Sequence, residues 1–263
     1  MMGPAHSLSG AAAWLGVGAA AGAAGHPMPW PVVVVGALIC AGAALAPDLD
    51  HKAATISRAF GPLSRGLCEV VDNISAAVYK ATRMKGDARR SGGHRTLTHT
   101  WLWAVLVGAG MSVLAVQGGR WAVLAILFVH MVLAIEGLLW RAARVSSDVL
   151  VWLLGAASAW ILAGVLDQPG NGSHWLFTGS GQEYLWLGLP IVLGALVHDI
   201  GDALTVSGCP IMWPIPIGRK RWYPVGPPKG MRFRAGSWVE LKVLMPIFTL
   251  LGGIGGLTAL GFL

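Results

Sequence analysis

Charged residues are scarce in this sequence, and their scarcity excludes an ordinary soluble domain. Lys, Arg, Asp and Glu make up 12% of the 263 residues, hydrophobic residues make up 55%, and the mean hydropathy is +0.63. A soluble domain usually carries about 25% charged residues, so this chain has too few to cover a surface that faces water. The composition therefore predicts an integral membrane protein, and the 13 tryptophans suit the headgroup level of a bilayer.

Cysteine is also sparse, which excludes two kinds of site. The three cysteines, Cys40, Cys68 and Cys209, are scattered and form no CxxC pair. Neither a disulfide framework nor a thiolate zinc site is indicated, so any metal would depend on His and Asp. No Lys or Arg precedes the apolar run from Ala11 to Gly25. The basic start of a signal peptide is missing, and we expect this run to remain as a helix.

Seven apolar runs approach the length of about 20 residues that crosses the hydrocarbon core. The first is weak because alanine and glycine dominate it, and the second is short. The sequence thus predicts an all-α, polytopic bundle of six to seven transmembrane helices in one membrane domain, residues 1–263. The runs lie near Leu8–Gly25, Trp30–Ala46, Trp101–Val116, Trp121–Trp140, Val149–Leu166, Tyr184–Val206 and Val243–Leu263.

Basic residues collect in two loops and predict the orientation. The loop from Asp167 to Glu183 has no Lys or Arg, so by the positive-inside rule it faces outward and the two basic loops face the cytoplasm. This explains the net charge of +7 without a nucleic-acid partner, and it gives a multi-pass membrane protein with a defined orientation. The two loops carry Lys52, Arg58, Arg65, Lys80, Arg83, Lys85, Arg89, Arg90 and Arg95, and Arg219, Lys220, Arg221, Lys229, Arg232 and Arg234.

Each basic loop has a predicted structure of its own. Residues 53–93 form a cytoplasmic insertion in which apolar residues from Ala53 to Arg83 recur at helical spacing. This pattern predicts an amphipathic helix or pair, broken near Gly61 and Pro62, that lies along the membrane or packs on the bundle. Residues 207–241 are rich in proline and glycine and predict a structured cytoplasmic loop or cap.

Four polar stretches fall at the cytoplasmic boundary of this topology. They are His6, "PDLDH" from Pro47, "HRTLTH" from His94, and "HDIGDALT" from His198. His198 and Asp202 are four residues apart on a helix, so both side chains leave one face and could bind one ion. Imidazole with carboxylate suits zinc, manganese or iron(II), and carboxylates that bridge make a site for one or two ions plausible.

These stretches supply the candidate site residues, and each also has a plainer interpretation. "PDLD" alone is commonly a turn or helix cap, HxxxD in a membrane helix could serve a proton relay, and an arginine at this level could anchor headgroups. We expect Arg95 to bind an anionic substrate group, His51 to act as an acid or as a partner of a ligand, and Asp50 to be catalytic as well as ligating. The expected metal ligands are His6, Asp48, Asp50, His94, His99, His198 and Asp202.

Taken in order, the motifs resemble the YdjM-like family of LexA-binding, inner membrane-associated proteins. The resemblance lies in His6, "PDLDH", "GHRTLTHT" and "HDIGDALTVSGCPIMWP", and hence in most of the chain. The resemblance implies a metal-dependent hydrolase of the bacterial inner membrane, with the His and Asp residues of the motifs as ligands. A looser similarity to zinc-dependent phospholipase C and P1-type nucleases implies phosphodiester or phospholipid cleavage. Thr96 stands where glycine is usual, and an extra pair of spans separates His99 from His198, so the substrate class is not carried over.

The function expected from these observations is hydrolysis of a phosphoester or lipid-like substrate at the cytoplasmic leaflet, through water activated by a divalent metal, zinc foremost. Membrane lipid and a small or lipid phosphoester are the expected partners. A metal or proton transporter is one alternative, but it would need polar residues that continue to the far side of the membrane. The outer halves of the spans are nearly free of them. A non-catalytic scaffold with a regulatory partner is the other alternative, and it would need no metal.

Overall fold

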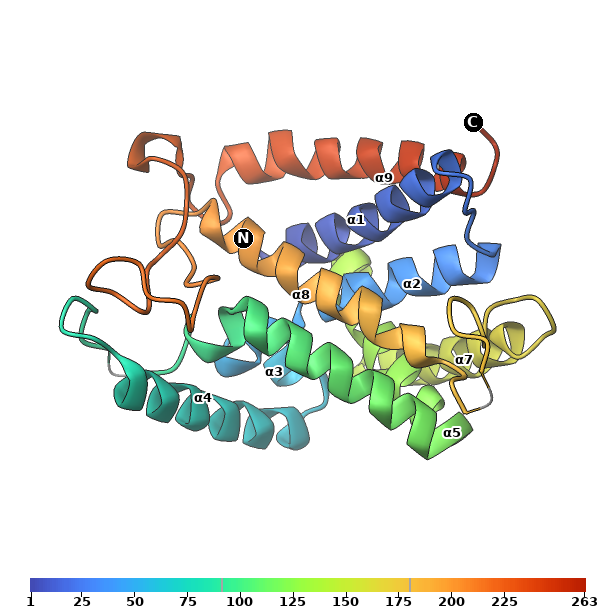
Figure 1. The fold of residues 1–263 in the computed structure, drawn as a ribbon, viewed down its shortest axis with the longest axis horizontal. Helices are drawn as coiled ribbons and strands as arrows, with labels where there is room; N and C mark the ends of the chain where they lie inside the picture. The colour runs from blue at the N-terminus through green and yellow to red at the C-terminus, as the bar shows by residue number, and fades with distance from the viewer. Residues whose placement is uncertain (91, 180) are drawn as a thin grey trace.

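The computed structural model describes residues 1–90, 92–179 and 181–263, and over these ranges the chain is helical (Figure 1). The described ranges contain no β-strand, and isolated bridges occur only in the segment from Thr205 to Phe233. The all-α prediction is therefore confirmed. The α-helices are α1 (Gly3–Ala23), α2 (Trp30–Ala43), α3 (Ile56–Ala59), α4 (Pro62–Thr82), α5 (Trp101–Leu138), α6 (Trp140–Ala143), α7 (Asp148–Leu166), α8 (Gly188–Ala203) and α9 (Met245–Ala259).

Five helical segments are long and apolar enough to cross a membrane. The first predicted span does form a helix, α1, but it is not among the five because alanine and glycine make it too weakly apolar. The third predicted span falls within the single segment α5, and so does the fourth except for its last two residues. The five segments are Trp30–Asp50, Trp101–Leu138, Asp148–Leu166, Leu185–Ala203 and Glu240–Ala259.

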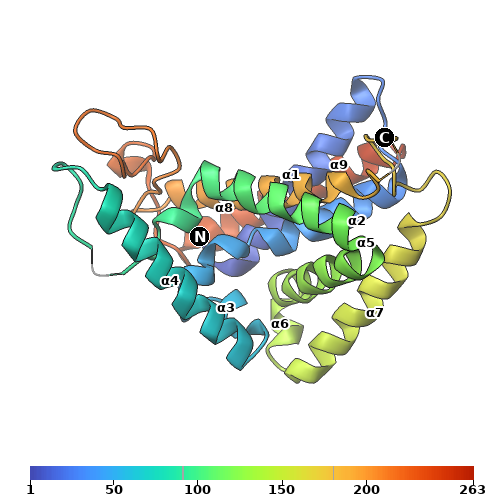
Figure 2. The same ribbon diagram turned by 60° about the horizontal axis from the view of Figure 1, so that its bottom comes forward.

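α5 reverses direction at Gly119 and therefore consists of two arms (Figure 2). Gly119 has φ 55° and ψ −147°, a conformation that glycine adopts without the clash of a side chain. The first arm begins beside the 207–241 segment, where the Trp101 N–H donates to the Ile211 carbonyl. The second arm ends against α1, since a methyl group added at Gly137 would collide with the Ser7 side chain. Both ends of α5 thus lie at one end of the bundle.

α2 lies at the centre of the bundle, where it packs against α1, α5 and α8. Its residues Val32, Val35 and Ile39 are fully buried. α1 and α8 both cross it at Cys40 through glycines: a methyl group at Gly10 would lie 2.6 Å from the Cys40 carbonyl oxygen, and one at Gly194 would lie 2.5 Å from it. Small residues at these crossings let the backbones approach closely. Three segments that carry predicted site residues are thereby held side by side.

The segment between α2 and α5 forms the short helix α3 and the long helix α4, which are separated at Gly61. α4 turns one face to the protein, and its buried residues are Ser64, Cys68, Val71, Ser75 and Tyr79. The apolar side chains of a neighbouring face point away from the protein; they are Leu63, Leu67, Val70 and Ile74. The 207–241 segment joins this region through Asp87, whose carboxylate accepts hydrogen bonds from the backbone N–H groups of Arg221 and Trp222.

Candidate metal centre

The polar stretches come together at the end of the bundle where both ends of α5 lie. α2 gives way to a 3-10 turn (Ala46–Asp50) that carries Asp48 and Asp50. A second 3-10 turn (Leu97–His99) leads into α5, which Thr100 caps by accepting a hydrogen bond from the Trp103 N–H. His198 and Asp202 project from the last turns of α8. The turns and α8 therefore present His and Asp side chains to one place.

Four of these side chains direct one ligand atom each toward a common point. His99 Nε2 lies 3.3 Å from His198 Nε2. The same His99 atom lies 3.5 Å from Asp48 Oδ1 and 3.7 Å from Asp202 Oδ2. His198 Nε2 lies 3.7 Å from Asp48 Oδ1 and 3.8 Å from Asp202 Oδ2. Two imidazole nitrogens and two carboxylate oxygens thus form a compact group, which we call the four-ligand group.

The four-ligand group fits a tetrahedral divalent ion. Zinc binds nitrogen and oxygen at about 2.0–2.2 Å, which places the ligand atoms of a tetrahedron about 3.4 Å apart. The five separations of 3.3–3.8 Å lie at or slightly above this value. His198 Nδ1 donates to the Ala44 carbonyl at 2.8 Å, and His99 Nδ1 lies 2.9 Å from the Thr98 hydroxyl. Both rings are thereby oriented with Nε2 toward the common point, as in metal-binding histidines.

A second group shares two members with the first. Asp48, Asp50, His94 and His99 also bring one ligand atom each within reach of one another. His94 Nδ1 is 2.8 Å from Asp50 Oδ1, while Asp50 Oδ2 accepts hydrogen bonds from Thr98 and from the Arg95 backbone. Two adjoining groups with a shared carboxylate are the arrangement that a two-ion site requires.

At His99, the charges of nearby carboxylates favour a bound proton, which a metal ion would have to replace. Burial lowers the pKa of His99, but its contacts with the Asp48 and Asp50 carboxylates outweigh that effect and raise the pKa to about 10. Without a metal, His99 therefore carries a proton between two carboxylates at neutral pH. A metal ion that binds there must displace this proton, because only the neutral imidazole is a ligand.

Arg95 and Asp202 are joined at the edge of the four-ligand group. Arg95 Nη2 lies 2.8 Å from Asp202 Oδ2, and Nη1 donates to the Thr205 hydroxyl at 3.1 Å. The guanidinium side chain is 17% exposed, so it also reaches solvent. The other Asp202 oxygen, Oδ1, pairs with the α-amino group of Met1 and lies 3.3 Å from His6 Nε2.

The two groups together contain six of the seven predicted ligands: Asp48, Asp50, His94, His99, His198 and Asp202. The seventh, His6, lies beside them but in neither group. Its ring stacks on His198 with centroids 3.8 Å apart, and neither of its nitrogens has a hydrogen-bond partner among the described residues. His51 is exposed, and its ring centroid lies 4.4 Å from that of His94. The role of each residue stays a prediction.

The sequence interpretation missed Asp199 and Cys209. Asp199 is fully buried, and neither carboxylate oxygen has a partner among the described residues. It follows His198 directly and therefore leaves α8 about 100° around the helix, off the His198 and Asp202 face. The sequence nevertheless carries a signal for Asp199, because an acidic residue within an apolar membrane helix usually has a function. Cys209 donates its thiol hydrogen to the His99 carbonyl at 3.3 Å, and burial together with Asp199 and Asp202 raises the pKa of the thiol.

Comparison with known proteins gives one family. The family model described as YdjM inner membrane protein matches residues 1–142, slightly more than half of the chain. No curated protein and no solved structure matches. The matched region holds the first three polar stretches, whereas the resemblance had been expected to extend through the stretch at His198. The predicted resemblance to this family is thereby confirmed over residues 1–142, and the region from α7 to α9 lies beyond the match.

Proposed function

This chain belongs to the YdjM inner membrane protein family, and from that premise we propose that it is a metal-dependent hydrolase of phosphoesters in the membrane. The observation that carries the proposal is the four-ligand group, in which three segments far apart in the sequence place two imidazole nitrogens and two carboxylate oxygens around one point. Ionisable side chains within membrane helices are costly to bury and normally have a task.

The proposal includes a topology of seven spans, in which α1 and both arms of α5 cross the bilayer. The end of the bundle that carries the centre also carries the basic residues Arg89 and Arg219, whereas the 167–183 loop at the far end of α7 has none. By the positive-inside rule the centre opens to the cytoplasm. The exposed apolar side chains of α4 would then rest on the inner leaflet, as in interfacial helices.

In this mechanism the residues of the centre have separate tasks. A divalent ion, zinc foremost, would lower the pKa of water toward about 7 and polarise a phosphoryl oxygen. Asp48, His99, His198 and Asp202 would hold it, and Asp50 and His94 would complete a second position. Arg95 retains N–H groups beyond those that bind Asp202 and Thr205, and these suit an anionic phosphoryl oxygen.

His51 is the residue suited to carry protons between the centre and solvent. Asp50 accepts a hydrogen bond from His94 Nδ1, which orients that ring, and the His51 ring lies next to it on the exposed side. The imidazole of His51 is exposed, so it can donate a proton to a leaving group and recover it from water.

The test is turnover of phospholipids and small phosphoesters by the purified protein under zinc, manganese or iron(II). We expect products with at least one metal, and a loss of about 100-fold in Asp50→Asn, because Asp50 orients His94 and Thr98 beside the ligands. Glu69→Gln is the matched control, since Glu69 is an exposed acid on α4. Absence of turnover with every metal and substrate would contradict the proposal and favour the scaffold alternative.

A further inference from the structure

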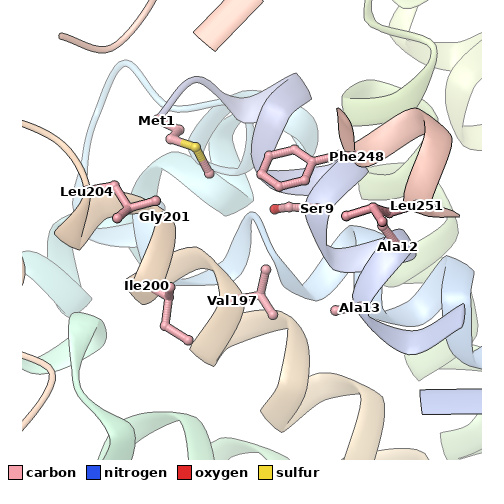
Figure 3. Close-up of a pocket in the computed structure, with 10 residues that line it drawn as sticks. All are labelled: Met1, Ser9, Ala12, Ala13, Val197, Ile200, Gly201, Leu204, Phe248 and Leu251. Carbon is pink, nitrogen blue, oxygen red and sulfur yellow. The ribbon is translucent and has the colours of Figure 1, made fainter. Parts of the chain in front are cut away.

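An apolar groove runs between α8 and α9, with α1 as its floor (Figure 3). Its volume is about 280 Å³. The Ser9 hydroxyl, one of the few polar groups on its wall, already donates to the His6 carbonyl. The side chains that shape the groove are Ala13 from α1, Val197 and Ile200 from α8, and Phe248 and Leu251 from α9. Its chemistry suits a hydrocarbon and offers almost nothing to a polar ligand.

The inner end of the groove lies against the metal centre. Gly201 and Met1 form part of the wall, and a methyl group added at Gly201 would collide with Met1 Cε and lie 3.3 Å from His6 Cε1 and 3.4 Å from His6 Nδ1. His6 Nε2 in turn lies 3.3 Å from Asp202 Oδ1. The groove is therefore separated from a carboxylate of the four-ligand group by the His6 ring and by Met1, whose α-amino group pairs with that carboxylate. Both nitrogens of that buried ring lack a hydrogen-bond partner among the described residues.

The outer side of the groove faces the surroundings of the bundle. Ile200 is 56% exposed and Leu251 is 54% exposed, and both lie on segments apolar enough to span a membrane. In a bilayer, the molecules that meet this surface are lipid acyl chains. A chain that enters the groove from the bilayer gains little free energy, because lipid tails are as apolar as the leucines that line proteins. The groove would therefore position a bound lipid, but it would contribute little to the free energy of binding.

We propose that this groove holds one acyl chain of the substrate, so that the substrate is a membrane phospholipid whose phosphate lies at the metal centre, beyond Met1 and His6. The inference rests on the proposed hydrolase function, and it restricts the substrate class from phosphoesters in general to phospholipids. A phospholipid matches both places. The centre supplies the Arg95 guanidinium for its anionic head, and the groove supplies hydrocarbon walls for its acyl chain. A water-soluble phosphoester would use the centre alone.

The first test detects the lipid without requiring turnover. The protein is placed in nanodiscs that contain a phospholipid with a photoactivatable diazirine on one acyl chain, and labelled residues are mapped by mass spectrometry. We expect several-fold more label on Phe248 and Leu251 than on Leu153 and Ile161 of α7, which are at least as exposed as Leu251. Equal labelling of the groove residues and the α7 residues would overturn the inference.

The second test separates the groove from the hydrolase proposal. Ala13→Phe fills the groove, whereas Leu250→Phe adds bulk to an exposed position of α9 that does not line it. Ala13→Phe should reduce lipid labelling to the α7 level and lower kcat/KM for the phospholipid about tenfold, with no change for a water-soluble phosphoester. Leu250→Phe should change neither. If the wild type hydrolyses neither substrate, the hydrolase proposal fails, while the labelling still decides whether the groove binds lipid.

Discussion

Replacing both His198 and Asp202 by alanine should remove bound metal from the purified protein almost completely. The two residues supply half of the four-ligand group from one face of α8, with Nε2 and Oδ2 3.8 Å apart. An ion left with His99 and Asp48 would lose two of its four protein ligands and be exposed to competition from water. Metal content measured by mass spectrometry after gel filtration in detergent should fall from about one or two ions per chain to near zero.

The matched control is a pair of the same chemistry at the other end of the molecule. His174 Nε2 lies 3.6 Å from a Glu183 carboxylate oxygen, and both side chains are exposed in the 167–183 loop. Replacing both by alanine should leave the metal content at the wild-type level. Circular dichroism and the gel-filtration profile establish that both variants are folded. Equal metal in the wild type and the His198 and Asp202 variant would refute the site.

Arg95→Gln should lower kcat/KM for phosphoester hydrolysis by about 10²–10³, the usual cost of removing a group that stabilises charge in the transition state. Arg95→Lys should recover little of the loss, because an ammonium group cannot bind a phosphoryl group through two parallel hydrogen bonds. Steady-state kinetics with a water-soluble phosphoester measures the effect apart from lipid binding. Arg89→Gln, which removes an exposed arginine of the same segment, is the control.

Metal content distinguishes the two roles that the contacts of Arg95 permit. Arg95 Nη2 contacts Asp202 Oδ2, so the residue could act by holding that ligand. If it binds substrate, Arg95→Gln retains its metal while turnover falls. Unchanged kinetics would exclude Arg95 from the reaction, and a parallel loss of metal and turnover would assign it to positioning Asp202.

The sequence was sufficient for features that depend on local pattern. Apolar runs located α2, α7, α8 and α9, and the spacing of His198 and Asp202 placed both on one helix face. The pair Gly118 and Gly119 separated two predicted spans, and the structure places the reversal of α5 there. The break at Gly61 was likewise signalled by the proline that follows it.

Features that depend on contacts between distant segments could not be predicted. The stacking of His6 on His198 follows from the way α1 and α8 cross α2, and no spacing in the sequence records it. Burial of Asp199 depends on the elements packed around α8, and the groove beside Gly201 depends on how α1 packs against its neighbours. Helical periodicity predicts which face of a helix a residue occupies. The neighbours of that face depend on how the helices pack, which the periodicity does not show.

The two halves of the chain contribute differently to the centre. Residues 1–142 match the family and supply Asp48 and His99, but His198 and Asp202 come from α8, beyond the match. The four-ligand group is therefore completed by a part of the chain that the family model does not cover. The ligand atoms of His198 and Asp202 nevertheless lie within 3.7 Å of those of the matched residues, and the two side chains share one face of α8.

The most direct test of this account is the position of the ion in crystals of the zinc-loaded protein, measured by anomalous scattering at the zinc absorption edge. We expect a peak among Asp48, His99, His198 and Asp202, with each ligand atom about 2.0–2.2 Å from it. A second peak beside Asp50 and His94 would mark the two-ion form. Zinc bound in stoichiometric amount at any other place, with the four side chains still paired as they are here, would contradict the account.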